Sequence, residues 1–270
     1  MFKDITIGQY VDGDSPIHKM DARVKILLSI LYIILLFVVS SPKAYAVFAI
    51  FTVLFVIISR VPVKYVLKGL RPMLYILIFT AVINLFATGG DTVLWQSSVW
   101  RSLKITKEGV TAATQMMLRL IFLIIGTSIL TLTTTPIMLT DGIEKLMKPF
   151  EVIKVPSHEI AMMMTIAIRF IPTLSEETEK IIKAQKARGA DFESGNILKR
   201  TRAMVPILVP LFISAFKRAD DLAIAMDSRC YNSGKKRTRM KQMKVTWIDA
   251  AAAGVMTAFF ALVIVAQRLW

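Results

Sequence analysis

The feature that most limits the fold is a series of long apolar runs. Helices rise about 1.5 Å per residue, so about 17 to 25 apolar residues cross a bilayer core. The chain is 55% hydrophobic with a mean hydropathy of +0.58, whereas average soluble domains are about 45–50% apolar. The sequence therefore predicts an all-α membrane protein with about five transmembrane helices, at Ile26–Ser41, Ala44–Ser59, Met73–Thr88, Met116–Thr134 and Val245–Ala266.

Basic residues flank these runs unevenly and indicate their orientation. One cluster lies between the second and third runs and another precedes the last run. Cytoplasmic loops carry an excess of Lys and Arg, so both clusters are predicted to be cytoplasmic, with the N-terminus inside and the C-terminus outside. The same rule explains the net charge of +15 without nucleic-acid binding, because no basic stripe alternates with aromatics. The clusters are Arg60, Lys64, Lys68, Arg71 and Lys235, Lys236, Arg237, Arg239, Lys241, Lys244.

The chain divides by composition into residues 1–134 (a membrane domain), 135–244 (a largely polar domain) and 245–270 (a final span). The polar domain contains two apolar segments, Ile160–Ile168 and Ala203–Phe216, which are too short to cross a bilayer. We expect the first segment to stop at Arg169–Pro172 and a charged helix to follow over 173–190, its acidic residues in the N-terminal turn. The second segment is predicted to continue as one helix towards Arg229.

Two arginines, Arg188 and Arg229, each lie between small residues near the predicted end of a helix. A cation there complements the helix dipole, which is one sufficient interpretation. The alternative is that the small neighbours let each guanidinium enter a groove on a partner and bind a carboxylate or carbonyl oxygens. The candidate site comprises Ala187, Arg188, Gly189, Ser228, Arg229 and Cys230.

The sequence argues against an enzyme. It contains no Gly-x-x-x-x-Gly-Lys phosphate-binding loop. Asp220 and Asp221 lack a third carboxylate or histidine nearby, and His18 and His158 are far apart in the chain. We therefore expect no catalytic residue, no metal site and no cofactor bound by this chain.

Four strings together resemble the transmembrane scaffold (T) subunit of energy-coupling factor (ECF) type ABC transporters. The resemblance covers nearly the whole chain, and its two arginine motifs lie 229 − 188 = 41 positions apart. The strings are Ser15–Lys25, Arg169–Leu174, Ala187–Ala190 and Met226–Tyr231.

The resemblance implies a cytoplasmic coupling domain of long crossed helices that dock into two ABC-type ATPase subunits, one arginine for each. ATP and Mg²⁺ would then bind to those partners. Cys230 replaces a more usual glycine, a change that small size would tolerate. The same region would contact a membrane-embedded substrate-binding subunit, although packing against the chain's own spans is the alternative for each side chain. The predicted contacts are Met162, Met163, Ile166, Phe170, Val205, Leu208, Val209 and Phe212.

The implied function is a non-catalytic scaffold for vitamin uptake in a bacterial or archaeal cell membrane, with substrate selectivity in another chain. A methionine-rich surface favours a scaffold shared by several substrate-binding subunits, and a dedicated metal-ion or single-vitamin module is the alternative. A conventional ABC permease would need polar residues facing a cavity, where the spans offer little besides Asn84. A lipid-modifying enzyme would need carboxylates or histidines clustered at a membrane boundary.

Overall fold

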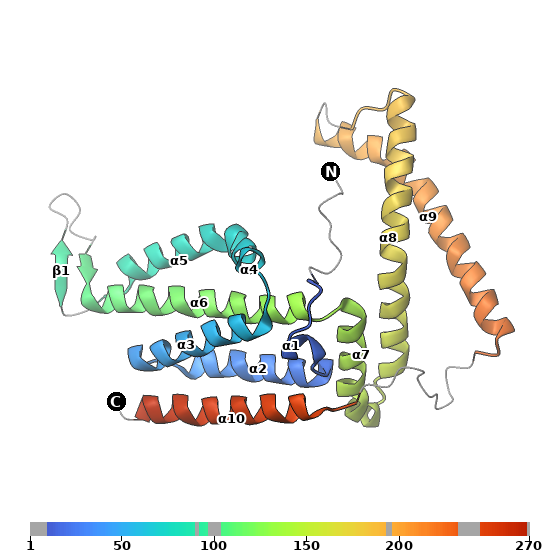
Figure 1. Cartoon of the computed structure of the whole chain (residues 1–270). Helices are drawn as coiled ribbons and strands as arrows, with labels where there is room; N and C mark the ends of the chain where they lie inside the picture. The colour runs from blue at the N-terminus through green and yellow to red at the C-terminus, as the bar shows by residue number, and fades with distance from the viewer. Residues whose placement is uncertain (1–9, 90–91, 97–103, 193–195, 232–243, 269–270) are drawn as a thin grey trace. The chain divides into compact units, whose positions relative to one another are not determined.

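The computed structural model describes residues 10–89, 92–96, 104–192, 196–231 and 244–268 (Figure 1). These residues form two compact units. The described residues of the membrane unit lie within Gly8–Ile143 and Met243–Trp270, and those of the inserted unit lie within Glu144–Gln242. The basic cluster at residues 235–241 lies outside the described residues.

Helices build almost all of the membrane unit, and Figure 1 shows α2, α3, α6 and α10 lying side by side. A 3-10 turn, Arg71–Met73, joins α4 to α5. The helices are α1 (Pro16–Lys19), α2 (Ala22–Val38), α3 (Pro42–Ser59), α4 (Val63–Leu70), α5 (Leu74–Ala87), α6 (Lys107–Thr133), α7 (Pro136–Met147, which continues into the inserted unit) and α10 (Trp247–Arg268).

The predicted all-α membrane fold is confirmed. Among the described residues, four helical stretches are long and apolar enough to cross a bilayer: α3, Val63–Ala87, α6 and α10. The remaining predicted span coincides with α2, whose 17 residues are at the lower limit for crossing. The count of five spans stays a prediction.

The predicted outer loop over 91–115 is wrong in part, because α6 begins at Lys107 and not near Met116. The Thr106 hydroxyl accepts a hydrogen bond from the Gly109 N–H at 3.0 Å and caps the helix. Before it, two short strands, β1 (Val93–Gln96) and β2 (Lys104–Thr106), pair antiparallel. The apolar pattern marked only the part of α6 that can lie in the membrane.

The core of the membrane unit is aromatic. The Tyr32 ring lies 4.9 Å from that of Phe48, which lies 5.6 Å from that of Phe122 (centroid distances). The Tyr32 hydroxyl donates to the Phe122 carbonyl at 3.1 Å and bonds the Thr52 hydroxyl at 3.0 Å. A Cβ added at Gly126 would lie 2.3 Å from Tyr32 Cε1, so glycine there allows α2 and α6 to approach closely.

Asn84, the polar residue of the third predicted span, makes a hydrogen bond within its own helix. Its amide donates at 2.8 Å to the Thr80 carbonyl, one turn earlier in α5. The bond satisfies the amide within its own helix, so Asn84 contributes no interhelical contact through that group.

The inserted unit contains a 3-10 segment, Lys148–Ile153, and two long helices, α8 (Ser157–Ala187) and α9 (Ile197–Ser228). The predicted stop at Arg169–Pro172 is wrong, because α8 continues through Pro172. Proline removes one backbone hydrogen bond, but Phe170 and Leu174 on either side of it both line the groove against α9. Packing therefore maintains the helix, and the acidic residues of 176–179 lie mid-helix.

Candidate functional site

The end of α8 forms a Schellman motif, in which backbone N–H groups beyond the helix bond its last carbonyls. Arg188 occupies the C-cap and Gly189 follows with φ +85°. The Gly189 N–H donates to the Lys186 carbonyl at 3.0 Å, and the Ala190 N–H donates to the Gln185 carbonyl at 3.0 Å. Gly189 therefore supplies the left-handed residue that ends this helix.

The end of α9 repeats the same motif residue for residue. Arg229 follows the last helical residue, and Cys230 takes the left-handed position with φ +53°. The Cys230 N–H donates to the Asp227 carbonyl at 2.8 Å, and the Tyr231 N–H donates to the Met226 carbonyl at 3.0 Å. The two arginines therefore occupy equivalent C-cap positions, and both side chains are exposed.

The two helices cross in antiparallel directions, which separates their arginines. Arg218 of α9 pairs with Glu177 of α8, whereas the Tyr231 hydroxyl beyond α9 donates to Met162 Sδ near the start of α8. From Met162 to Arg188 is 188 − 162 = 26 residues, or on the order of 40 Å along a helix. The two arginine motifs therefore lie at opposite ends of the helix pair, as the ribbons in Figure 1 also show.

Glu177 of α8 makes polar contacts with α9 at the crossing. Arg218 Nη2 donates to Glu177 Oε2 at 2.9 Å, and both side chains are partly exposed. A hydrogen bond from Ser214 and the positive charge of Arg218 lower the pKa of the Glu177 carboxyl. Because the ion pair is partly exposed, it contributes only about 0.2–1 kcal/mol of stability.

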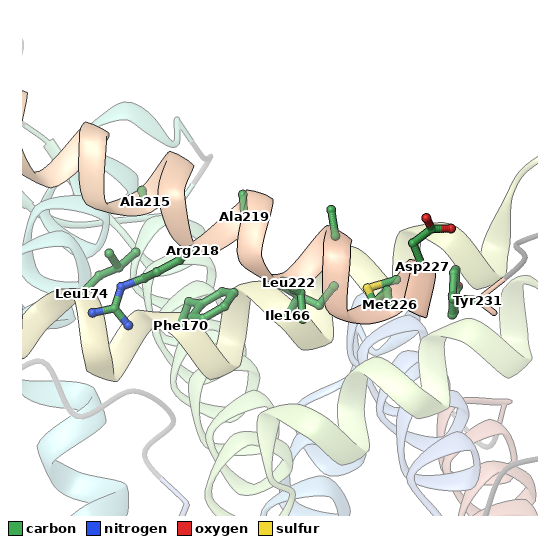
Figure 2. Close-up of a pocket in the computed structure, with 11 residues that line it drawn as sticks. Ile166, Phe170, Leu174, Ala215, Arg218, Ala219, Leu222, Met226, Asp227 and Tyr231 are labelled. Atoms are coloured by element: carbon green, nitrogen blue, oxygen red, sulfur yellow. The ribbon is translucent and has the colours of Figure 1, made fainter. Parts of the chain in front are cut away.

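An apolar groove of about 460 Å³ runs between α8 and α9 from Arg218 and Leu174 to Tyr231 (Figure 2). Ile166 and Phe170, two of the predicted partner contacts, line it and face Leu222 and Met226 of α9. A third, Met162, accepts the Tyr231 hydrogen bond. These three side chains of α8 therefore lie against the chain's own second helix.

The other predicted contacts lie on the surface of the inserted unit. Met163 of α8 is 60% exposed. Along α9 the exposed fractions run from 45% for Leu208 to 60% for Phe212, with Val205 and Val209 between them. These four residues, with the exposed Ile213 and Phe216, form an apolar strip on α9 that no described residue of the inserted unit covers. Exposed apolar strips of this kind mark contact surfaces.

Among the described residues, no three His, Cys, Asp or Glu side chains are arranged to hold a metal ion. The apolar spans, the aromatic core and the inserted pair of crossed helices define a multi-pass helical membrane protein.

Comparison with known proteins identifies the family. The model of the CbiQ family, which is described as "Cobalt transport protein", matches residues 13–240. The chain is 55% identical over 271 residues to the energy-coupling factor transporter transmembrane protein EcfT of Clostridium kluyveri, covering 100% of this chain and 99% of that one. It is 52% identical over 270 residues to the protein of that name from Ruminiclostridium cellulolyticum, with full coverage of both chains. The chain therefore belongs to the CbiQ family, and its predicted identification as the transmembrane component of an energy-coupling factor transporter is confirmed.

Sequence reasoning singled out both arginines but explained Cys230 by small size, whereas the structure gives Cys230 a left-handed backbone. A signal for this conformation was available, since glycine at the matching position of the other motif is typical of it. The charged stretch Lys217–Asp221 was interpreted as a solvated or salt-bridged helix face, and the structure shows Arg218 paired with Glu177, a partner that the sequence did not identify.

Proposed function

We propose that this chain is a non-catalytic scaffold that couples ATP hydrolysis in two cytoplasmic ATPase subunits to the reorientation of a membrane-embedded substrate-binding subunit. ATP and Mg²⁺ bind to the ATPases and not to this chain. Closure of the ATPases moves the crossed helices through Arg188 and Arg229, and the helices move the substrate-binding subunit. Such coupling requires two states of the helix pair that ATP binding stabilises differently.

The observation that carries the proposal is the duplicated helix end. Arg188 and Arg229 both occupy the C-cap position, each is followed by the same pair of Schellman hydrogen bonds, and they lie at opposite ends of an antiparallel pair. The two arginine cations are equivalent, exposed and widely separated. They can therefore bind two copies of the same kind of groove, one on each of two related ATPase subunits. A helix-dipole role alone would require neither the exposure nor the repetition.

The apolar strip of α9 supports the second contact. A strip of aromatic and aliphatic side chains on a helix can bind the apolar surface of a partner such as a membrane-embedded subunit. Met163, also exposed, adds an adaptable side chain on α8. We assign Val205, Leu208, Val209 and Phe212 to this contact, with Met162, Ile166 and Phe170 shaping the helix pair beneath it.

The basic residues set the proposed orientation. The basic residues Arg60, Lys64, Lys68 and Arg71, all exposed, support a cytoplasmic position for the segment between α3 and α5. The inserted unit and N-terminus are then cytoplasmic and the C-terminus is outside. This orientation gives cytoplasmic ATPases access to the two arginines.

The substrate class is proposed to be vitamins, and a transition-metal ion is the second candidate because the family is described by cobalt transport. Uptake by the purified complex of a panel of radiolabelled vitamins (riboflavin, folate, biotin and thiamine) and of radiolabelled cobalt separates them. Vitamin uptake supports the shared-scaffold proposal. Uptake of cobalt alone makes this chain part of a dedicated metal-ion module.

ATPase docking is tested by co-purification from detergent-solubilised membranes, comparing wild type with Arg188→Ala, Arg229→Ala and the double variant. We expect two ATPase subunits with wild type, weaker recovery with each single variant and loss with the double variant. Arg169→Ala is the matched control, because Arg169 is an exposed arginine in the middle of α8. Equal recovery with the double variant and the control would refute the docking role.

A further inference from the structure

Two helices of the membrane unit, α7 and α10, connect it to the inserted unit, and both begin beside one buried polar cluster. α7 follows Thr133 and Thr134 and runs into the inserted unit at Glu144, and α10 follows Thr246. The start of α7 is the point of departure and the start of α10 is the point of return, and these are the two chain passages. Both are tied to the N-terminal end of α2, the second through Asp249. All residues of the cluster belong to the membrane unit.

Lys25 holds the point of departure. Its ammonium donates to the Thr133 carbonyl at 2.9 Å and to the Thr134 hydroxyl at 3.1 Å. A third bond, at 3.4 Å, goes to the carbonyl of His18. An ammonium has three donors, so these acceptors account for all of them, and the residue is only 5% exposed. Lys25 therefore ties the end of α6 to α2.

Asp249 holds the point of return. Its Oδ2 accepts from the N–H of Thr246 at 2.6 Å and from the Thr246 hydroxyl at 2.9 Å, which caps α10. Its Oδ1 accepts from the N–H of Asp21, the N-cap of α2, at 2.8 Å. Asp249 is 1% exposed, and its carboxylate attracts the Lys25 ammonium.

The segment before α2 completes the cluster. His18 Nδ1 bonds the Ser15 hydroxyl at 2.6 Å and its Nε2 bonds the Val11 carbonyl at 3.0 Å. The Val11 N–H in turn donates to the Leu132 carbonyl at 2.9 Å. The folded N-terminal segment thereby lies against the end of α6 and presents the His18 carbonyl to Lys25.

We propose that Asp21, Lys25, Thr134 and Asp249 form a clamp that fixes both chain passages to the N-terminus of α2, so that movement of the inserted unit is transmitted to the spans. The inference rests on the proposed function. Without the clamp, the first turns beside the passages would absorb that movement. The four are positioning residues, since none is assigned to an ATPase or substrate contact.

The test uses the complete complex in lipid vesicles and measures molecules imported per ATP hydrolysed, with the vitamin or cobalt probe that wild type imports. Lys25→Met and Asp249→Asn each remove hydrogen bonds made by a buried charged group. The free energy of such bonds corresponds to a fall of about tenfold in the number of molecules imported per ATP hydrolysed. ATP hydrolysis by the assembled complex should persist. A merely structural role would instead lower the amount of assembled complex and leave the ratio of each complex unchanged.

The other end of α2 supplies matched controls. Arg119 of α6 donates to the Val39 carbonyl at 3.0 Å, and Gln267 of α10 donates to the Val38 carbonyl at 3.0 Å. Arg119→Met and Gln267→Leu therefore loosen the same helix pairs away from the passages, and we expect the wild-type ratio. An unchanged ratio in Lys25→Met, or an equal fall in the controls, overturns the clamp.

Two further measurements keep the test decisive. If Lys25→Met fails to assemble, Thr134→Val removes only one of the three acceptors and should lower the ratio about threefold; no change overturns the proposal. If wild type imports nothing with ATP, the proposed function fails separately. Amide hydrogen exchange then tests the clamp, and exchange at residues 134–143 and 244–250 must be faster in Lys25→Met than in Gln267→Leu.

Discussion

The left-handed backbone of Cys230 predicts that Cys230→Gly stabilises the end of α9. A residue with a Cβ is destabilised by about 1–2 kcal/mol in this conformation, because the Cβ approaches the neighbouring carbonyl. Glycine loses more backbone freedom on ordering, by about 0.5–1 kcal/mol. The net gain for Cys230→Gly, at φ +53°, is therefore about 1 kcal/mol.

The same calculation with the opposite sign applies to Gly189, which holds the equivalent position at φ +85°. Gly189→Ala adds a Cβ that meets no neighbouring atom within 4 Å, so the backbone conformation alone is perturbed. We expect a loss of about 1 kcal/mol at the end of α8.

Amide hydrogen exchange in the purified complex measures both effects. A change of about 1 kcal/mol alters the opened fraction of a helix end about fivefold. Exchange at Cys230 and Tyr231 should slow by that factor in Cys230→Gly, and exchange at Gly189 and Ala190 should accelerate in Gly189→Ala. Cys230→Ala keeps the Cβ and removes the thiol, so it should match wild type. Faster exchange in Cys230→Gly, or equal slowing in Cys230→Ala, would refute the reasoning.

Three other experiments test the packing of each unit. Gly126→Ala places a Cβ against the Tyr32 ring and should cost about 1–3 kcal/mol of stability; thermal unfolding in detergent should show a lower Tm, whereas Gly254→Ala, which meets open space, should not. Tyr32→Phe removes the hydroxyl bonds and should cost about 0.6 kcal/mol in the same assay. A double-mutant cycle of Arg218→Met with Glu177→Gln should give a coupling of about 0.5 kcal/mol. Because the folded pKa of Glu177 is lowered, this contribution is present above its unfolded pKa of about 4.3 and should disappear as the pH falls below it.

Apolar length and charge bias were sufficient to predict the class of fold. The runs that became α3, α6 and α10 are long enough that few structures other than membrane helices can bury them. Sequence also located Arg188, Gly189 and Arg229, because helix ends carry local signals in cations and glycine. These features depend on neighbours in the chain, which a sequence displays directly.

Features that depend on distant partners were not predictable in the same way. Pro172 is a helix-breaking signal on its own, and only the packing of Phe170 and Leu174 on α9 makes the helix continuous. Asp249 bonds the Asp21 N–H across 228 positions. In the sequence it is one acid near the start of a span, and nothing local indicates which backbone group it bonds.

The composition of α9 finally favours a partner over internal packing. Pro206 and Pro210 each lack the N–H that would bond a carbonyl one turn earlier, and α9 changes direction near its crossing with α8 (Figure 1). On the same stretch, Phe212 and Ile213 are 60% and 64% exposed. A helix that lacks backbone hydrogen bonds and exposes aromatic surface gains little stability within its own unit.

We therefore expect Phe212→Ser to weaken co-purification of the substrate-binding subunit without destabilising this chain. Ile224→Ser is the control, because Ile224 is also exposed but lies further along α9, and it should leave this co-purification unchanged. Destabilisation of the isolated chain by Phe212→Ser would instead favour internal packing.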